Sequence, residues 1–265
     1  MGAGPIELSY VDLAVATGLV VVAGVVSLAL QLGLARRLAV AATRTAIQLL
    51  IIGYVLKWVF KIDSPWVLLP VMGFMIFVAG RAAVERTGRR YPGAMGDAFV
   101  TLVLCSLLTT FTVTEAVIGV TPWYTPQYVI PLLGMILGNS LTGISLCLDA
   151  LLERFSEQQG LIEMELAHGA TRWEAARDVL RDAVRRGMIP IINSMMVVGL
   201  VSLPGMMTGQ ILAGNPPLQA VQYQIVVMFM LAGATALGCI GVALLAYRRL
   251  FNAKHQLRAE LISKV

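Results

Sequence analysis

The side chains best suited to chemistry in this 265-residue sequence are polar and sulfur-containing groups set inside apolar stretches. One stretch is interrupted by the run Ser202-Leu203-Pro204-Gly205, and Met206 and Met207 follow directly. Proline removes a backbone hydrogen bond and glycine permits unusual dihedral angles, so we expect a helix to break here. Thioethers are ligands for soft ions such as Cu(I), but they are also adaptable packing groups. We interpret residues 203–210 as a candidate pathway or gate, with hydrophobic packing as the alternative role of the methionines.

Other polar side chains also fall within apolar stretches. A polar group inside a bilayer is costly, so it faces a neighbouring helix or a wet cavity. Arg44 and Gln48 are four residues apart and share a helix face. Arg44 lies near the end of its stretch, where we expect it to anchor the helix at the lipid headgroups. Hydrogen bonding between helices is the alternative role for the amides. The further pathway candidates are Gln48, Asn139, Asn193 and Met196.

Glu115 is the least expected acidic residue, because it lies near the end of an apolar stretch. Two roles are open: a contact for a metal ion at the exit of a pathway, or a carboxylate that reaches interfacial water. The sequence has no group of ligands with the local spacing of a three-ligand metal site, and its three cysteines lie singly in apolar stretches. The sequence therefore leaves a metal site undefined and predicts no catalytic residues.

The elements that must hold these groups are long apolar helices. The chain is 58% hydrophobic and 13% charged, about half the charged fraction of a typical soluble domain. Its apolar stretches are long enough to cross a bilayer as helices. We predict an all-α, polytopic membrane protein in which residues 1–265 form a single transmembrane domain. Seven spans are predicted, at residues 8–35, 38–60, 66–80, 98–120, 128–150, 188–213 and 220–247.

The distribution of basic residues predicts the orientation of these spans. If the N-terminus is outside and the C-terminus is cytosolic, 18 of the 20 lysine and arginine residues fall on the cytosolic side. Only Lys57 and Lys61 then lie outside. Loops rich in lysine and arginine stay in the cytoplasm, so this split favours seven spans in that orientation.

The largest polar segment, residues 151–187, is cytosolic in this topology, and its pattern predicts a helix, a turn and a second helix. Ser156 is expected to cap the first helix. Gly169 can end that helix in the left-handed conformation. Thr171 and Glu174 have the spacing of a capping box, which satisfies free backbone N–H groups where a helix begins.

This segment resembles the EAA loop that permease subunits of ABC transporters insert into their ATPase. Glu163 lies six residues before Gly169, as in that motif, and Gly169-Ala170-Thr171 fits its turn. The motif's two alanines are Met164 and Glu165 here, and the closing proline comes later, at Pro190. An amphipathic linker on the bilayer surface is the alternative. The resemblance implies a cytosolic coupling element in which an ATPase contacts Glu163, Glu165, Gly169, Ala170, Thr171 and Trp173.

Nearly the whole chain after the first span resembles the FetB-type permeases, bacterial iron-export ABC permeases whose family includes plant aluminium-tolerance permeases. The likeness is densest over LAHGATRWEAARDVL, residues 166–180, and SLPGMMTGQILAG, residues 202–214. It implies a permease subunit rather than an enzyme, present as two copies in the bacterial inner membrane. A separate cytosolic ATPase would hold ATP and magnesium, so no cofactor is expected on this chain, and no nucleic-acid partner. The sequence itself contains no GxxxxGK[ST] phosphate-binding loop.

The implied activity is export of iron, or of another metal or chelate, from the cytoplasm. Three alternatives stay open. The same spans suit an ATP-independent transporter or channel. Plant relatives have been linked to nucleotide-sugar movement, which leaves a nucleotide-sugar ABC permease as a second alternative. The third is a membrane scaffold that uses the cytosolic segment only to recruit a partner.

Overall fold

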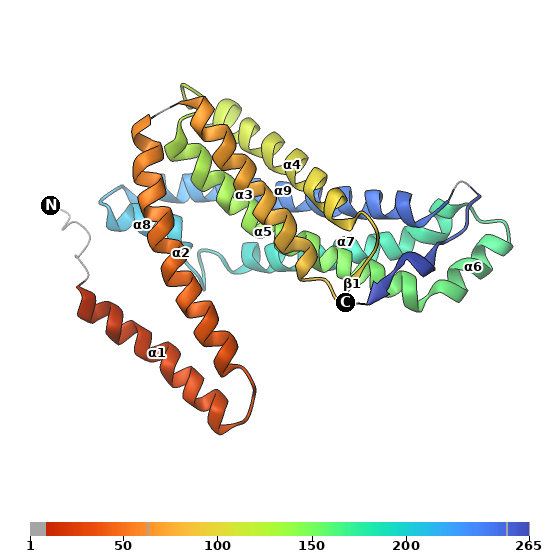
Figure 1. Ribbon diagram of the computed structural model, residues 1–265. Helices are drawn as coiled ribbons and strands as arrows, with labels where there is room; N and C mark the ends of the chain where they lie inside the picture. The colour runs from red at the N-terminus through yellow and green to blue at the C-terminus, as the bar shows by residue number, and fades with distance from the viewer. Residues whose placement is uncertain (1–8, 63, 253, 265) are drawn as a thin grey trace.

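The computed structural model describes residues 9–62, 64–252 and 254–264, and most of them are helical (Figure 1). The first predicted span begins at residue 8, outside the described residues. The π-helix η1 continues α4, and the short strands β1 and β2 pair antiparallel. The elements are α1 (Tyr10–Ala29), α2 (Ala35–Ile62), α3 (Pro65–Glu85), β1 (Arg89–Arg90), α4 (Ala94–Phe111), η1 (Thr112–Ile118), α5 (Pro126–Glu157), α6 (Gln159–Ala167), α7 (Arg172–Val197), α8 (Gly205–Leu212), α9 (Pro217–Leu250), η2 (Ala259–Leu261) and β2 (Ser263–Lys264).

Six helices of the described residues are long and apolar enough to cross a membrane: α1, α2, α3, α4 with η1, α5 and α9. Six of the seven predicted spans therefore have a helical counterpart. The remaining one, residues 188–213, is divided between the end of α7 and the short helix α8. The orientation of the spans stays a prediction.

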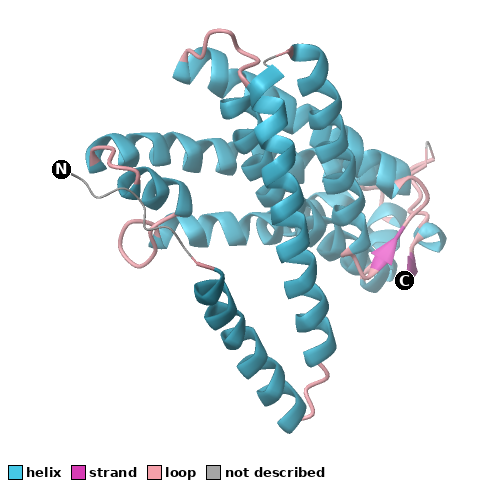
Figure 2. Cartoon of the chain, turned by 60° about the vertical axis from the view of Figure 1, so that its left-hand side comes forward, coloured by secondary structure: helices cyan, strands magenta, loops and turns pink. Residues whose placement is uncertain are grey.

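The core of the bundle lies where α5 packs against α7 and α9, with α3 and α4 on the outside of α5 and α9 (Figures 1 and 2). The fully buried side chains of α5 include Leu148, Leu151, Leu152 and Phe155. Sequence analysis placed the last three of these in a separate polar segment that begins at residue 151. Helix α5 runs past residue 150 to Glu157, so the first part of that segment continues α5 with one face buried in the core.

Helix α7 packs into this core where its Gly187 meets Gly143 of α5. A Cβ atom at Gly187 would lie 2.7 Å from the Gly143 carbonyl oxygen and 2.6 Å from the Cys239 sulfur. A Cβ atom at Gly143 would lie 2.5 Å from a methyl carbon of Thr235. Small residues let membrane helices approach until their backbones touch. The crossing of α5, α7 and α9 therefore requires glycine at both positions.

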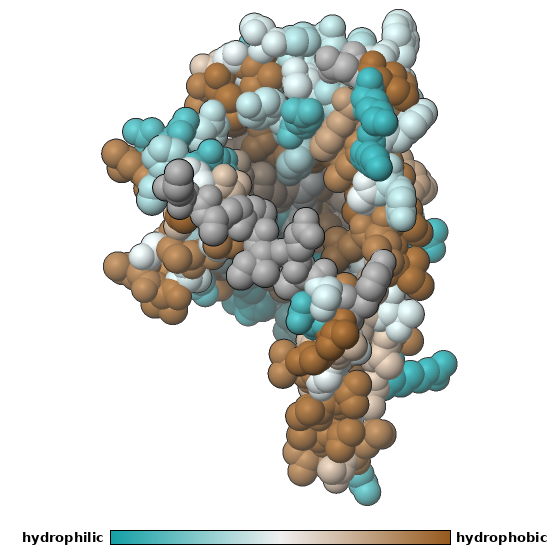
Figure 3. All heavy atoms as spheres, turned by 90° about the vertical axis from the view of Figure 1, so that its left-hand side faces the viewer, coloured by the Kyte–Doolittle hydropathy of each residue, from teal (hydrophilic) through white to brown (hydrophobic). Residues whose placement is uncertain are grey.

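The helices α1 and α2 form a hairpin that projects from the bundle (Figure 1). Most of their described side chains are exposed, including Leu19 at 76%. Hydrophobic side chains cover much of the projecting part in Figure 3. Exposed apolar helices of this length are suited to lipid or to another membrane helix rather than to water.

The arginine-rich end of the bundle, which we call the basic end, is held by ion pairs. Arg154 of α5 lies 2.9 Å from Asp182 of α7, and Glu153 lies 3.6 Å from Arg186. The end also contains Asp97, a buried carboxylate at 4% exposure that begins α4. It accepts hydrogen bonds from the Tyr91 hydroxyl at 2.7 Å and from Nε of Arg249 at 2.6 Å. These contacts connect α4, α5, α7 and α9 at the basic end.

Candidate functional site

The turn between α6 and α7 has the local structure that the sequence predicted. Gly169 has φ of 96°, and the Ala170 N–H donates to the Glu165 carbonyl. The capping box is present: the Glu174 N–H donates to the Thr171 hydroxyl, and the Glu174 carboxylate accepts from the Thr171 N–H at 2.7 Å. The predicted Ser156 cap is wrong, because Ser156 lies inside α5 and α6 begins at Gln159 without a side-chain cap.

The capping box also affects an ionisable group. Hydrogen bonds from the Thr171 backbone N–H and hydroxyl hold the pKa of the exposed Glu174 carboxyl below its ordinary value. A lowered pKa in the folded state means that the ionised form stabilises the turn. This stabilisation is complete above the unfolded-state pKa of about 4.3, and it is lost as the pH falls through the folded-state pKa.

Thr171→Ala is expected to loosen the first turn of α7. Losing the cap leaves a helix N–H without its partner, and we expect amide hydrogen exchange at residues 172–175 to become about fivefold faster. Exchange measured by mass spectrometry in detergent checks this. Thr171→Ser keeps the hydroxyl and serves as the matched control. Equal exchange in the alanine and serine variants would contradict a capping role.

The other coupling candidates lie around this turn. Glu163 and Gly169 are exposed, and Glu165 and Ala170 are half-buried. Glu163 accepts a hydrogen bond from Gln159 one turn earlier, at 2.7 Å. Trp173 is 47% exposed and packs edge-to-face on Tyr247, near the end of α9, with ring centroids 5.8 Å apart. The turn thus touches the end of a second long helix.

The C-terminal segment also contacts this turn, which sequence analysis missed. The Arg172 N–H, at the start of α7, donates to Nδ1 of His255 at 3.2 Å. Phe251 is buried and packs against Phe155 of α5, with ring centroids 5.8 Å apart. β2 pairs with β1 and holds the segment at the basic end. No sequence spacing connects residues so far apart, so only the folded structure reveals these contacts.

At the far end of α7, the predicted break starts earlier than expected. The helix ends at Val197, and Gly199 has φ of 84° with its N–H bonded to the Ser202 carbonyl at 2.9 Å. Pro204 is the residue at which α8 is capped. Leu200 is 89% exposed in this break. Non-helical backbone at membrane depth must be buried in protein or must line a wet cavity, so this exposed segment is a site of interest.

The pathway candidates have different environments. Met207 is buried at 7% exposure, whereas Met206 is half-buried. Asn193, Met196 and Ser202 are exposed. The structure therefore does not gather the predicted thioethers around one point. It assigns only Met206 to the cavity described next.

The candidates on other helices are separate from these. Gln48 is exposed on α2, beside Arg44. Asn139 donates to the Met135 carbonyl of its own helix at 3.0 Å. Glu115 is exposed on η1. Within the described residues no group of three or more His, Cys, Asp or Glu side chains is placed to hold a metal ion.

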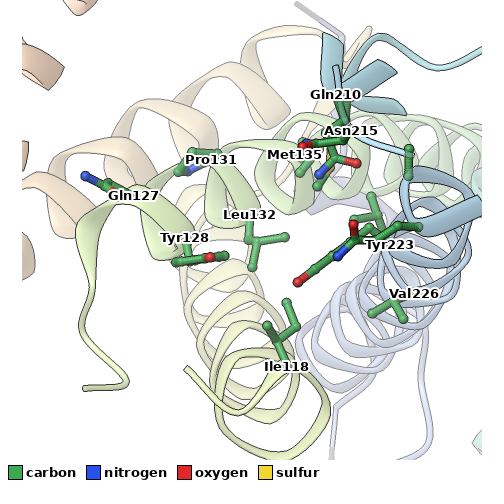
Figure 4. A pocket seen from close by; sticks show the side chains of 14 residues that line it. Ile118, Gln127, Tyr128, Pro131, Leu132, Met135, Gln210, Asn215, Tyr223 and Val226 are labelled. Atoms are coloured by element: carbon green, nitrogen blue, oxygen red, sulfur yellow. The ribbon is translucent and has the colours of Figure 1, made fainter. Parts of the chain in front are cut away.

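A cavity of about 390 Å³, shown in Figure 4, lies beside α8 at the end of the bundle opposite the basic end (Figure 1). Its walls are the end of η1, the first turns of α5 and α9, and α8 with the loop after it. Sequence analysis found only Met206 and the polar run around it, because the other walls come from distant segments. The polar and sulfur-containing residues that line it are Gln127, Tyr128, Met135, Met206, Gln210, Asn215, Gln219 and Tyr223.

The long apolar helices and the amphipathic turn define this chain as a polytopic α-helical membrane protein. Comparison with known proteins assigns the chain to a family. Residues 10–251 match the family described as "Uncharacterised protein family (UPF0014)", and the chain belongs to this family.

Three relatives align over nearly their whole length. The "UPF0014 membrane protein slr1647" of Synechocystis is 38% identical in an alignment that covers 95% of this chain and 97% of that protein. The "Probable iron export permease protein FetB" of Escherichia coli is 36% identical over 96% of both chains. The Arabidopsis thaliana "Protein ALUMINUM SENSITIVE 3" is 34% identical over 94% of this chain and 90% of its own. No solved structure matches the chain.

Proposed function

We propose that this protein is the permease subunit of an ATP-binding-cassette transporter that exports iron, free or chelated, from the bacterial cytoplasm. The observation that carries the proposal is α7, one continuous helix from the turn at Gly169 to the break after Val197. The name of the Escherichia coli relative, a probable iron export permease, supports the substrate. The basic end faces the cytosol, and the protein lies in the inner membrane.

Transport on this proposal needs two further chains. A cytosolic ATPase binds ATP and magnesium, since the sequence has no phosphate-binding loop of the GxxxxGK[ST] type. A second copy of this chain packs against the exposed apolar helices of the first. Together the two copies enclose the pathway.

Helix α7 is the mechanical connection between the ATPase and the pathway. Its 26 residues span about 39 Å, enough to cross the bilayer core. The ATPase contacts the turn between α6 and α7, and closure of its nucleotide sites displaces this turn. Because Gly187 is packed against Gly143 and Cys239, α7 pivots about this crossing rather than sliding past α5 and α9. The movement reaches the break at residues 198–204, which opens or closes the opposite end.

Gly169→Val is expected to uncouple the ATPase while the bundle stays inserted. A β-branched residue is strained at φ of 96°, so the turn must change shape. We expect substrate-stimulated ATP hydrolysis by the reconstituted complex to fall at least tenfold. Gly160→Val is the matched control, because Gly160 lies on α6 with open space around its Cα and without a positive φ. Transport at an undiminished rate by the purified chain without any ATPase would overturn the proposal and favour an ATP-independent transporter.

A further inference from the structure

We propose that the 390 Å³ cavity binds an uncharged organic group rich in hydroxyl or amide functions, and that it does not bind a bare metal cation. This inference rests on the proposed function, since it names the class of substrate that leaves through this end of the bundle. Cavities that bind small molecules begin at about 300 Å³. The volume therefore accommodates a neutral metal chelate of small ligands or a disaccharide.

The first argument is the convergence of hydrogen-bonding groups. Tyr128 comes from the first turn of α5, Gln210 from α8, and Tyr223 from α9. Asn215 lies in the loop between α8 and α9, and Gln219 lies in the first turn of α9. Figure 4 shows Gln210 and Asn215 on one side of the space and Tyr223 across from Tyr128, whereas Gln127 points away. Carboxamides and phenols can each donate and accept, which suits hydroxyl and amide groups.

The second argument is that one of these hydrogen-bonding groups, the carboxamide of Gln210, has an acceptor that no group of the described residues satisfies. In the part of the chain that the structure describes, Oε1 of Gln210 is shielded from solvent and has no hydrogen-bond partner. Tyr223, which also lines the cavity, is half-buried. A buried acceptor without a partner is costly, so a ligand donor that reaches this oxygen removes that cost.

The third argument is charge. Among the described residues that line the cavity there is no Asp, Glu, His, Cys, Lys or Arg. Iron and other hard or borderline cations are bound in proteins mostly by carboxylates, imidazoles, thiolates or phenolates, and apart from the phenols of Tyr128 and Tyr223 the lining supplies none of these. The two thioethers, of Met135 and Met206, are soft ligands and too few to replace a hydration shell. A neutral ligand needs no countercharge, and it matches the walls that are present.

The cavity is also connected to the proposed mechanism. Met206 and Gln210 belong to α8, which follows the break at residues 198–204 directly. A displacement of the break moves one wall of the cavity relative to the walls formed by α5 and α9. Binding and release at this site can therefore follow the movement of α7.

Equilibrium dialysis of the full chain in lipid nanodiscs tests the inference directly and needs no ATPase. The probes are sucrose, the neutral tris(acetohydroxamate) complex of Fe(III), and Fe(II) alone under reducing conditions. We expect sucrose or the neutral complex to bind and Fe(II) not to bind at this site. The double variant Gln210→Leu/Tyr223→Phe is expected to weaken that binding at least tenfold. Gln222→Leu, an exposed carboxamide on α9 outside the cavity, is the matched control.

Each result of the dialysis experiment supports or overturns the proposed ligand class of the cavity. Binding of the iron complex alone identifies a chelate site. Binding of sucrose alone identifies a sugar site and counts against iron as the substrate; both results support the uncharged ligand class. Failure of both neutral probes to bind overturns the inference. So does Fe(II) binding that the double variant abolishes. An equal thermal midpoint in the double variant and the wild type shows that a lost affinity is not lost folding. Coupled transport that fails while binding persists would count against the ABC proposal and leave the cavity's ligand class standing.

Discussion

Gly187→Leu is expected to leave little correctly folded protein in the membrane. Even a single methyl group at this position would lie 2.7 Å from the Gly143 carbonyl oxygen and 2.8 Å from Cβ of Cys147. These two atoms belong to the backbone and to the first side-chain carbon of α5, so no rotamer change can move them away. Inserting extra atoms into a packed core costs about 1–3 kcal/mol where side chains can yield, and more where backbone must separate. We therefore expect α7 to lose its place between α5 and α9.

The three buried cysteines provide the measurement. Cys105, Cys147 and Cys239 are all shielded in the core, so a dye that fluoresces on reaction with thiols reports unfolding on heating. We expect Gly187→Leu to react at low temperature and Gly187→Ala to show an intermediate midpoint. Gly73→Leu is the matched control, because this glycine lies on α3 and a Cβ atom there would meet no neighbouring atom within 4 Å. Equal midpoints for Gly187→Leu and Gly73→Leu would contradict the close crossing.

Arg249→Met is expected to lower the free energy of unfolding by about 2 kcal/mol. The substitution leaves the Asp97 carboxylate buried with only the Tyr91 hydroxyl as a side-chain donor. Breaking a fully buried pair costs about 3–5 kcal/mol, but Arg249 itself is 51% exposed and water replaces part of the interaction. For a chain of this size the loss corresponds to a thermal midpoint roughly 5 °C lower.

A double-mutant cycle measures the interaction energy between Asp97 and Arg249 apart from their contacts with other residues. Asp97→Asn removes the charge but keeps an acceptor for Tyr91. The variant with both substitutions is expected to lose about 1 kcal/mol less than the sum of the single variants, because each single variant already removes the pairing. The thiol-reactive dye again gives the midpoints. Strict additivity would mean that the 2.6 Å contact contributes nothing to stability.

Tyr91 supports the same network from outside the spans. Burial raises the pKa of its hydroxyl well above the ordinary value, and the hydrogen bond to Asp97 raises it further. The hydroxyl therefore remains a donor to Asp97 throughout the physiological pH range. The contribution of the Tyr91–Asp97 hydrogen bond to stability should consequently be the same at neutrality and at about pH 9, below the ordinary pKa of a tyrosine.

Local features were predictable from the sequence wherever neighbouring residues determine them. The turn at Gly169 and the capping box of Thr171 and Glu174 were identified correctly, since both depend on a few consecutive residues. The break before Pro204 was also predicted, but its start was not, because Gly199 bends the chain before the proline does. Helix α5 runs past the predicted span, which ends at residue 150, and its last turns look polar although one face is buried.

Only the tertiary structure determines which residues surround the turn, the helix crossing and the cavity. Hydropathy and charge along the chain were enough to establish long membrane helices, because crossing a bilayer depends on composition and length within a single segment. The contact of His255 with α7, the crossing of Gly187 with Gly143, and the cavity shared by Tyr128, Gln210 and Tyr223 join residues that are far apart in sequence. Apolar helices in lipid pack by shape and by a few polar contacts, and the complementarity of shapes is a property of the packed helices rather than of any one segment.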